Sequence, residues 1–336
     1  MKAVAYKTPG SIDREEALQD ITLAKPTAEG RDLLVKIHAV SVNPVDTKLR
    51  LSKQPDGEWR VLGFDAVGTV EAVGPEVQTF QPGDAVFYAG SIARPGTNSE
   101  YHLVDERIVG RKPASLSDAE AAALPLTAIT AWEMLFDRLQ VNSPTTQGGD
   151  TILIIGGAGG VGSMTLQLLR ALTDLTIIAT ASRPETQAWV REHGAHHVIN
   201  HRQPLVPQME ALGLKAPGFV FSTTHTDSHF ADIVELIAPQ GRFGLIDDPK
   251  ALNVMPLKTK AVSLHWELMF TRSLFNTPDI AKQGELLNEV AALVEAGRIR
   301  STATEVAGKI EAKTLRAVHA QIESSSTRGK IVLEGF

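Results

Sequence analysis

Residues 151–169 read TILIIGGAGGVGSMTLQLL, and this stretch decides the fold. An apolar strand over Asp150–Ile155 is followed by Gly157-x-Gly159-x-x-Gly162 and then by a helix over Ser163–Leu172. Glycines at this spacing permit a tight turn and let the backbone approach a diphosphate, while the helix N-terminus offers N–H donors. The strand-turn-helix context therefore predicts a dinucleotide site; the alternative is a glycine-rich loop without a ligand.

Strands and helices continue to alternate after this turn. Short apolar strands are predicted at Leu175–Ala181, Val198–Asn200, Phe219–Ser222 and Arg242–Ile246, with helices at Pro184–His193 and Phe230–Ile237. Alternation of this kind is typical of a parallel sheet that is covered by helices on both faces.

The end of the second strand bears on the choice of cofactor. An NAD site places an acidic residue there, about 20 residues after the fingerprint, to bind the ribose hydroxyls. Here the chain reads Ala179-Thr180-Ala181-Ser182-Arg183, and no acid comes before Glu185. The guanidinium of Arg183 and the hydroxyl of Ser182 suit a 2′-phosphate, which favours NADPH over NADH. The alternative is that Arg183 is a solvated residue before a helix that Pro184 opens.

The N-terminal part of the chain has a different pattern of predicted elements. Turn residues separate short β-type runs at Met1–Tyr6, Leu33–Val42, Ala66–Val73, Ala85–Tyr88 and Glu100–Val104. This spacing predicts a compact, mostly antiparallel domain of barrel type. Ser117 and Glu120 then have the spacing of a capping box at a helix start.

The C-terminal tail contains a predicted long helix over Pro278–Gly297, a helix over Ala312–Ser324 and a short strand over Lys330–Leu333. A return of this tail to the first domain is one possibility that the sequence leaves open.

Composition narrows the class further. A chain of 336 residues is suited to two domains. A net charge of −6 gives no reason to expect binding to nucleic acid or to an anionic membrane. The chain has no cysteine, which excludes disulfides and thiolate metal sites. No signal peptide or membrane helix is evident, and we expect a cytoplasmic protein.

Several segments resemble one known family, the quinone-oxidoreductase branch of the medium-chain dehydrogenases/reductases. They are VSVNPVDTKLR (40–50), LGFDAVGTVEAVGPEV (62–77), FQPGDAVF (80–87), ALPLTAITAWEML (123–135), IIGGAGGVG (154–162), GAHHVINHR (194–202) and RGKIVLEGF (328–336). The segment HWELMFTRSLF (265–275) is similar to a bacterial subgroup labelled "zinc-type alcohol dehydrogenase-like".

The resemblance implies an α/β fold in which a doubly wound Rossmann sheet is inserted in a GroES-like, mostly antiparallel β-barrel catalytic domain. The implied divisions are 1–125 for the first part of the GroES-like domain, 126–265 for the NADP-binding domain and 266–336 for the returning segment. It also implies a homodimer or homotetramer.

The chain departs from the zinc-dependent members of this family. Asn43 stands where they carry a cysteine, and Gly63-Phe64-Asp65 stands where they carry Gly-His-Glu. Only a short loop joins Ala93 to Glu100, where those enzymes carry a lobe with four cysteines. A phenyl ring cannot ligate zinc and an amide oxygen is a poor substitute for a thiolate, so we expect no metal site.

Without a Lewis acid, oxidation of a simple alcohol is difficult. Reduction of a quinone or of an activated α,β-unsaturated carbonyl needs only hydride from NADPH and hydrogen-bond donors for the developing charge. This reduction is the leading hypothesis for function. The alternatives are enoyl-thioester reduction, zinc-dependent alcohol oxidation and a non-catalytic NADPH-binding protein.

The resemblance also assigns site residues. Asn43 and Thr127 are the catalytic candidates, with a turn residue beside Pro44 and a helix cap as their ordinary interpretations. Besides the glycines, Ser182 and Arg183, the cofactor contacts are Ala158, Gly160 and Val161 in the turn, His201 near the adenosine, Leu245, Ile246 and Asp247 near the nicotinamide, and Lys330.

A pocket for a flat, hydrophobic substrate is predicted from Asp46, Phe64, Trp266 and Phe270. A buried helix face is the alternative for the cluster of His265, Trp266, Met269 and Phe270. Asp46 and Asp65 are also candidates for hydrogen bonds that brace the site.

Overall fold

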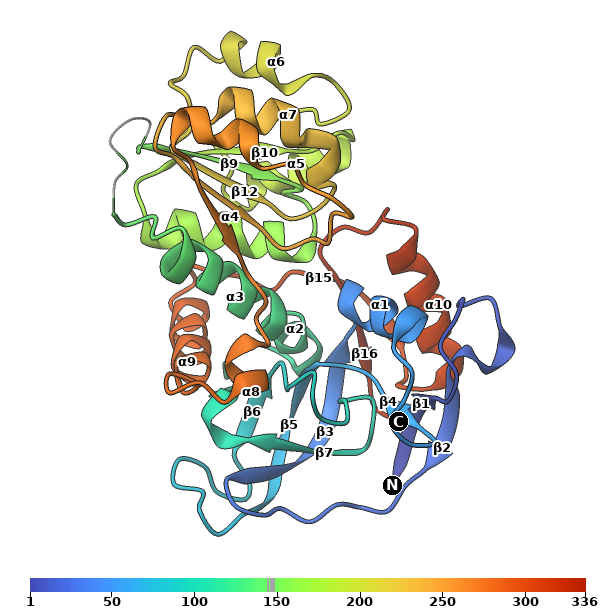
Figure 1. The fold of residues 1–336 in the computed structure, drawn as a ribbon. Helices are drawn as coiled ribbons and strands as arrows, with labels where there is room; N and C mark the ends of the chain where they lie inside the picture. Colours follow the sequence, from blue (N-terminus) through green and yellow to red (C-terminus); the bar gives the residue numbers. More distant parts are fainter. Residues whose placement is uncertain (144, 146–148) are drawn as a thin grey trace. The chain divides into compact units, whose positions relative to one another are not determined.

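The computed structural model describes residues 1–143, 145 and 149–336. Within them the chain forms two compact units, one from residues 1–129 and 270–336 and the other from residues 130–269 (Figure 1). These divisions fall four residues after the expected boundaries at 125 and 265. None of the helices in the described part is long and apolar enough to span a bilayer.

The second unit is built on a sheet of six parallel strands. They are β9 (Thr151–Ile155), β10 (Thr176–Thr180), β11 (His197–Ile199), β12 (Phe219–Ser222), β13 (Arg242–Leu245) and β14 (Ser263–Trp266), in the order β11-β10-β9-β12-β13-β14. The helices are α4 (Gly160–Leu172), α5 (Pro184–Glu192), α6 (Leu205–Ala211) and α7 (Thr226–Leu236). Figure 1 shows α4 on one face of the sheet and α7 on the other. The predicted doubly wound sheet is confirmed.

The central strands are apolar throughout because both faces of the sheet are covered. All five residues of β9 are buried. One core cluster includes Leu153, Ile178 and Val220 from three adjacent strands, packed with Ile233 of α7. The strand β14 was not predicted, because its run SLHW is short and was considered as a possible helix face.

The first unit is mostly antiparallel, as expected. Its large sheet has the order β15-β16-β3-β5-β6-β8, with β7 also paired to β3, and a small sheet has the order β2-β1-β4. The strands are β1 (Lys2–Tyr6), β2 (Gln19–Thr22), β3 (Asp32–Ser41), β4 (Arg60–Val61), β5 (Asp65–Val73), β6 (Ala85–Tyr88), β7 (Tyr101–Asp105), β8 (Val109–Arg111), β15 (Ala303–Gly308) and β16 (Lys330–Glu334).

The C-terminal tail belongs to this first unit, which settles the question that the sequence left open. Strand β16 pairs antiparallel with β3, with Val332 opposite Ser41, and parallel with β15. Helix α10 (Ala312–Glu323) packs on α1 (Pro44–Ser52), where the buried Arg50 forms an ion pair with Glu323. Chain ends that are far apart in sequence therefore share one core.

The first unit also contains helices besides α1 and α10. They include α2 (Asp118–Ala122), α3 (Pro125–Trp132, which continues into the second unit), α8 (Thr271–Phe275) and α9 (Lys282–Glu295). The predicted capping box of α2 is confirmed, since Glu120 N–H donates to Ser117 Oγ at 3.2 Å and Ser117 N–H donates to the Glu120 carboxylate at 2.9 Å.

Candidate functional site

The glycine turn lies between β9 and α4 in the second unit. Gly156 has a φ of +82°, a conformation that favours glycine, and its N–H donates to Thr180 Oγ1 at 3.0 Å. A Cβ at Gly162 would come within 2.4 Å of the Gly156 carbonyl oxygen, whereas a Cβ at Gly159 would meet only that same oxygen, at 3.8 Å. Gly162 therefore permits close packing of the turn, and the space above Gly159 is open.

This turn fits a diphosphate. Helix α4 begins at Gly160 with Gly159 as its N-cap, and no side chain of the described residues caps it. The N–H groups of the first helical turn point out of such an end and carry the positive end of the helix dipole. Ala158, Gly159, Gly160 and Val161 are partly exposed, while Gly157 and Gly162 are buried. The predicted turn residues thus divide into an accessible rim and a packed base.

Ser182 and Arg183 follow β10 at the same carboxyl-end edge of the sheet. Arg183 is the N-cap residue of α5, and its Nε lies 3.0 Å from Oε1 of Glu185. About one third of the Arg183 side chain is exposed. The acid that follows the strand in sequence is thus an ion-pair partner of the arginine, and an incoming phosphate would compete with it.

His201 and the residues after β13 border this region of the second unit. His201 Nδ1 lies 3.2 Å from Thr180 Oγ1, the oxygen that also accepts from Gly156 N–H. Leu245 is buried at the end of β13, followed by the half-exposed Ile246. Asp247 accepts from the N–H of Thr226 at 2.8 Å and from its hydroxyl, so its carboxylate holds the start of α7.

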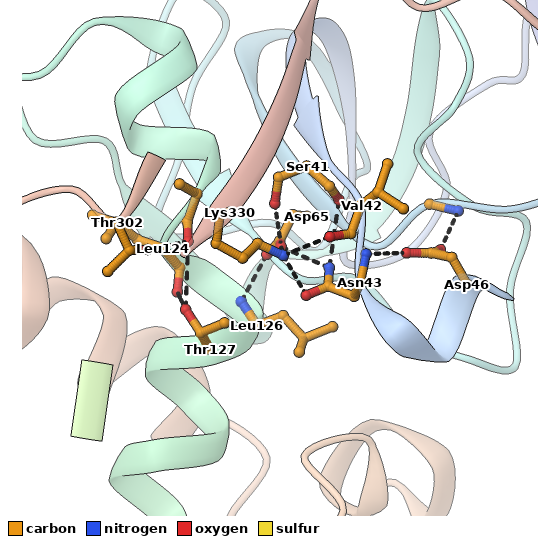
Figure 2. A network of polar contacts seen from close by, with 12 residues as sticks. Ser41, Val42, Asn43, Asp46, Asp65, Leu124, Leu126, Thr127, Thr302 and Lys330 are labelled. Atoms are coloured by element: carbon orange, nitrogen blue, oxygen red, sulfur yellow. Dashed lines mark hydrogen bonds and ion pairs between the residues drawn. The ribbon is translucent and has the colours of Figure 1, made fainter. Parts of the chain in front are cut away.

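In the first unit, a buried ion pair links the C-terminal strand to β5. Lys330 Nζ lies 3.1 Å from Oδ2 of Asp65, and both side chains are almost completely buried. Asp65 also accepts from Ser41 Oγ at 2.6 Å, and from the Leu126 N–H, at the start of α3, at 2.7 Å. Figure 2 shows how these side chains converge. The carboxylate thereby joins β3, β5, α3 and β16.

Asn43 lies inside this network. Its Nδ2 donates to Asp65 Oδ2 at 2.8 Å and to the Ser41 carbonyl at 3.4 Å, and its Oδ1 accepts from Lys330 Nζ. Lys330 Nζ also donates to the Val42 carbonyl at 2.9 Å. The structure gives the Asn43 amide buried protein partners, which argues against donation to a substrate. Likewise, Lys330 is neither an exposed surface lysine nor placed to offer its ammonium group outside this network.

Asp46 occupies the first turn of α1 and is buried. It accepts from the N–H of Asn43 at 2.7 Å and from the N–H of Gly63 at 3.0 Å. Burial raises the pKa of Asp46 to about 7, although these two donors and the nearby Lys330 oppose the rise. Asp46 therefore braces the turn before α1 and titrates near neutral pH, but it does not face an open surface.

The other catalytic and pocket candidates differ in how far their side chains are buried. Thr127 of α3 is 2% exposed, and its Oγ1 donates to the carbonyl of Leu124, just before the helix, at 2.9 Å. Phe64 and Phe270 are buried against each other in the first unit, with ring centroids 4.7 Å apart. Trp266 is 54% exposed at the end of β14 in the second unit. The aromatic cluster is thus not a single helix face.

A metal ion does not fit the residues present. Across residues 1–143, 145 and 149–336, no group of three or more His, Cys, Asp or Glu side chains is placed to hold one. Asp65 is occupied by Ser41, Asn43, Leu126 and Lys330, and Phe64 has no ligand atom. At the positions where the zinc-dependent members carry metal ligands, this chain thus has a network of hydrogen bonds around Asp65 and the side chain of Phe64.

Gly156, Thr180 and Ser41 were not among the predicted site residues. Gly156 precedes the fingerprint glycines, but its positive φ makes the turn possible. Thr180 fixes the turn from the neighbouring strand, and its signal was its position at the last residue of β10. Ser41 gave no signal, because its contact with Asp65 depends on strand pairing.

Comparison with known families agrees with this geometry. The alcohol dehydrogenase GroES-like domain matches residues 29–114, and the zinc-binding dehydrogenase family matches residues 193–333. The zinc-type alcohol dehydrogenase-like protein SAV2186 of Staphylococcus aureus is 41% identical over 99% of both chains. The chain belongs to the medium-chain dehydrogenase/reductase superfamily of oxidoreductases. Its similarity is to the members called zinc-type alcohol dehydrogenase-like proteins.

Solved structures of similar proteins share the fold of this chain. A Rhizobium etli CFN 42 protein, provisionally described as a zinc-dependent alcohol dehydrogenase, is 61% identical with a TM-score of 0.99, covering 100% of this chain and 98% of its own. Escherichia coli quinone oxidoreductase complexed with NADPH has a TM-score of 0.83 at 22% identity, over 99% and 100% of the two chains, and so shares the fold. Mycobacterial Rv1454c complexed with NADPH is 25% identical, with a TM-score of 0.80 over the same shares.

Proposed function

We propose that this protein is an NADPH-dependent reductase that transfers hydride to quinones or activated α,β-unsaturated carbonyls without zinc. The observation that carries the proposal is the edge of the second unit's sheet, where an uncapped glycine turn is followed by Ser182 and Arg183 instead of an acid. An acid at the end of the second strand is the usual determinant of NAD binding, and arginine suits a 2′-phosphate. The NADPH named with Rv1454c agrees with this choice.

When bound, NADPH would supply the hydride. The residues of the chain itself would bind and orient the cofactor. The first turn of α4 would hold the diphosphate with backbone N–H groups, and Arg183 would hold the 2′-phosphate. Thr127 Oγ1 donates a hydrogen bond to the Leu124 carbonyl oxygen, so toward a ligand this hydroxyl could act only as an acceptor.

Asn43 then acts as a positioning residue and not as a donor to the substrate. Its amide connects Lys330 to Asp65, and Asp65 fixes the Leu126 N–H next to Thr127. Asp46 can hold or release a proton at Oδ near neutral pH, because the pKa of its carboxyl is raised to about 7. Because no metal-ligand group is found among the described residues, the proposal assigns the stabilisation of developing charge to hydrogen-bond donors.

Three alternatives remain beside this proposal. Zinc-dependent alcohol oxidation is named for the Rhizobium etli protein, but Asn43 and Phe64 stand at the positions that need ligands. A non-catalytic NADPH-binding protein would share the glycine turn and lack turnover. Enoyl-thioester reduction would differ from the main proposal only in the substrate.

The experiment follows NADPH absorbance with the purified protein and a panel of small quinones, enones, enoyl thioesters and alcohols. Metal content is measured in the same preparation, before and after treatment with a chelator. We expect turnover with quinones or enones that chelation leaves unchanged. Alcohol oxidation that is lost on chelation and restored by zinc would refute the proposal, and tight NADPH binding without turnover would favour the binding-protein alternative.

We also propose that the protein forms a homodimer through the β14 edge. In the described residues β14 pairs only with β13, and Trp266 and Leu268 at its end are 54% and 50% exposed. An unpaired edge strand with exposed apolar side chains is a template for a second strand. A two-fold pairing of β14 with its copy would cover both features.

A further inference from the structure

A cavity of about 250 Å³ lies in the first unit, and none of the predicted site residues lines it. Its walls come from the loop after β6, from β7 and the 3₁₀ turn that follows it (Glu106–Ile108), and from α8 with the segment that leads to α9. The buried side chains of Ile108 and Ile280, together with Leu103 and Val104, form its apolar part. The volume is small for a ligand pocket and suits a compact molecule with an apolar body.

Two arginines line the cavity, and each is held by an aspartate. Nη1 and Nη2 of Arg94 donate to the two carboxylate oxygens of Asp32 at 2.7 and 2.8 Å. Nε and Nη2 of Arg107 donate to Asp105 at 2.9 and 2.7 Å, and Nη2 also donates to Oδ1 of Asn276 at 3.0 Å. A guanidinium carries five N–H groups, so both arginines keep unused donors. Among the described residues, Nε of Arg94 and Nη1 of Arg107 have no hydrogen-bond acceptor.

Two smaller polar side chains add further donors to the wall of the cavity. Oδ1 of Asn276 is used by Arg107, whereas its Nδ2 has no acceptor within the described part of the chain. Oγ of the buried Ser91 accepts from the Ala93 N–H at 3.4 Å, and its O–H has no acceptor in the same part of the chain. Both carboxylate oxygens of Asp105 already accept from Arg107. A ligand that completes this set of groups must therefore supply acceptors.

The charges at the cavity balance one another. The two arginines are matched by Asp32 and Asp105, and the neighbouring Glu106 is paired with Arg31 at 2.8 Å. An anionic ligand would meet no excess of positive charge, and it would share a guanidinium with an aspartate that repels it. An uncharged carbonyl oxygen accepts from the free N–H groups without that repulsion. The balance of charge thus favours an uncharged ligand.

We propose that this cavity is a second ligand site of the protein, for a small uncharged molecule that joins a carbonyl oxygen to an apolar body. The carbonyl oxygen accepts from the free Nε–H of Arg94, and the apolar body packs on Ile108 and Ile280. Arg107 and Asn276 offer donors to any further oxygen of the ligand. The glycine turn belongs to the second unit and shares no residue with this cavity, so binding here needs no dinucleotide. No covalent bond changes.

The experiment is a ligand-observed NMR titration of the full chain without cofactor. The probe is N,N-dimethylbenzamide, which has a carbonyl acceptor, no N–H donor and no activated double bond that the proposed reaction could reduce. Benzoate has a similar body and is the anionic comparison. The test variants are Arg94→Gln, which removes the guanidinium, and Ser273→Phe, which fills the cavity from α8. The control is Arg111→Gln, because Arg111 also pairs with an aspartate, Asp84, at 3.1 Å but does not line the cavity.

For the wild type we expect N,N-dimethylbenzamide to bind with a Kd of about 1 mM, the scale for a ligand of this size, and benzoate to bind more weakly. Each test variant should weaken binding of the amide about tenfold or more, and the control should match the wild type. Melting temperatures show which variants are folded. If Arg94→Gln is not, Ser273→Phe decides, because it leaves both ion pairs in place. Equal binding of the amide by the wild type and a folded test variant, tighter binding of benzoate than of the amide, or no binding of the amide by the wild type would overturn the inference.

Discussion

Nζ of Lys330 lies 3.1 Å from Oδ2 of Asp65, and this buried pair joins the last strand of the protein to the strand that begins at residue 65. Loss of one partner leaves an uncompensated buried charge, which typically costs about 3–5 kcal/mol. We expect Asp65→Leu to reduce the free energy of unfolding by that amount in denaturant titrations. The double variant Asp65→Leu/Lys330→Met should recover part of the loss, and equal instability of both variants would contradict the pairing argument.

Asp46 should make stability fall as pH rises. Its folded pKa of about 7 lies above the value of an ordinary aspartate, so the folded state keeps a proton that the unfolded state has already lost. Between about pH 4 and pH 7 this group lowers the free energy of unfolding by up to about 1.4 kcal/mol per pH unit. The measurement is the stability difference between wild type and Asp46→Asn at several pH values; a pH-independent difference would count against the raised pKa.

Replacement by alanine should affect stability differently at two glycines of the turn. In Gly162→Ala the new Cβ would lie 2.4 Å from the Gly156 carbonyl oxygen, so we expect a lower melting temperature together with loss of NADPH binding. In Gly159→Ala the nearest atom is 3.8 Å away, so we expect the fold to persist while NADPH binding weakens at least tenfold. Unchanged NADPH affinity in Gly159→Ala would show that no diphosphate lies over that turn.

Substitutions of Arg183 and of Glu185 should have opposite effects on the affinity for NADPH. Arg183→Ala should weaken NADPH binding about tenfold or more and NADH binding little, because only NADPH presents a phosphate to the guanidinium. Glu185→Gln should strengthen NADPH binding, since it removes the carboxylate that lies 3.0 Å from the arginine. The control is Arg191→Ala, an exposed residue of α5. Equal losses for both cofactors in Arg183→Ala would remove the case for NADPH.

The proposed dimer gives a prediction at the edge of the second unit's sheet. We expect the wild type to sediment as a dimer and Leu268→Glu to sediment as a monomer at the same concentration, because a charge replaces an apolar side chain that is half exposed. Phe275→Glu is the control, since Phe275 is 71% exposed in the first unit. A monomeric wild type, or a dimeric Leu268→Glu variant, would contradict pairing through β14.

Much of the fold could be predicted because its signals are local. The run from Thr151 to Leu172 carries a strand, a glycine turn and a helix start within one stretch, and the structure has β9 and α4 there. β14 was not predicted, because a four-residue run at a sheet edge has no clear periodicity and takes its conformation from β13. Helix α1 was likewise not predicted within the segment that carries Asn43.

The surroundings of the site residues could not be predicted in the same way. Lys330 and Asn43 are 287 residues apart, and only the pairing of β16 with β3 brings them together. The sequence suggested Asn43 as a donor to the substrate, and the tertiary structure gives its amide two charged partners instead.

The amino-acid sequence by itself determined the two unit types, the glycine turn and the lack of thiolate ligands, because these depend on residue identity and short-range spacing. The tertiary structure decided which polar groups remain available to a ligand. Hydrogen bonds between residues hundreds of positions apart, such as that from Lys330 to Asn43, are formed only when strand pairing and burial bring the groups together and remove water from them.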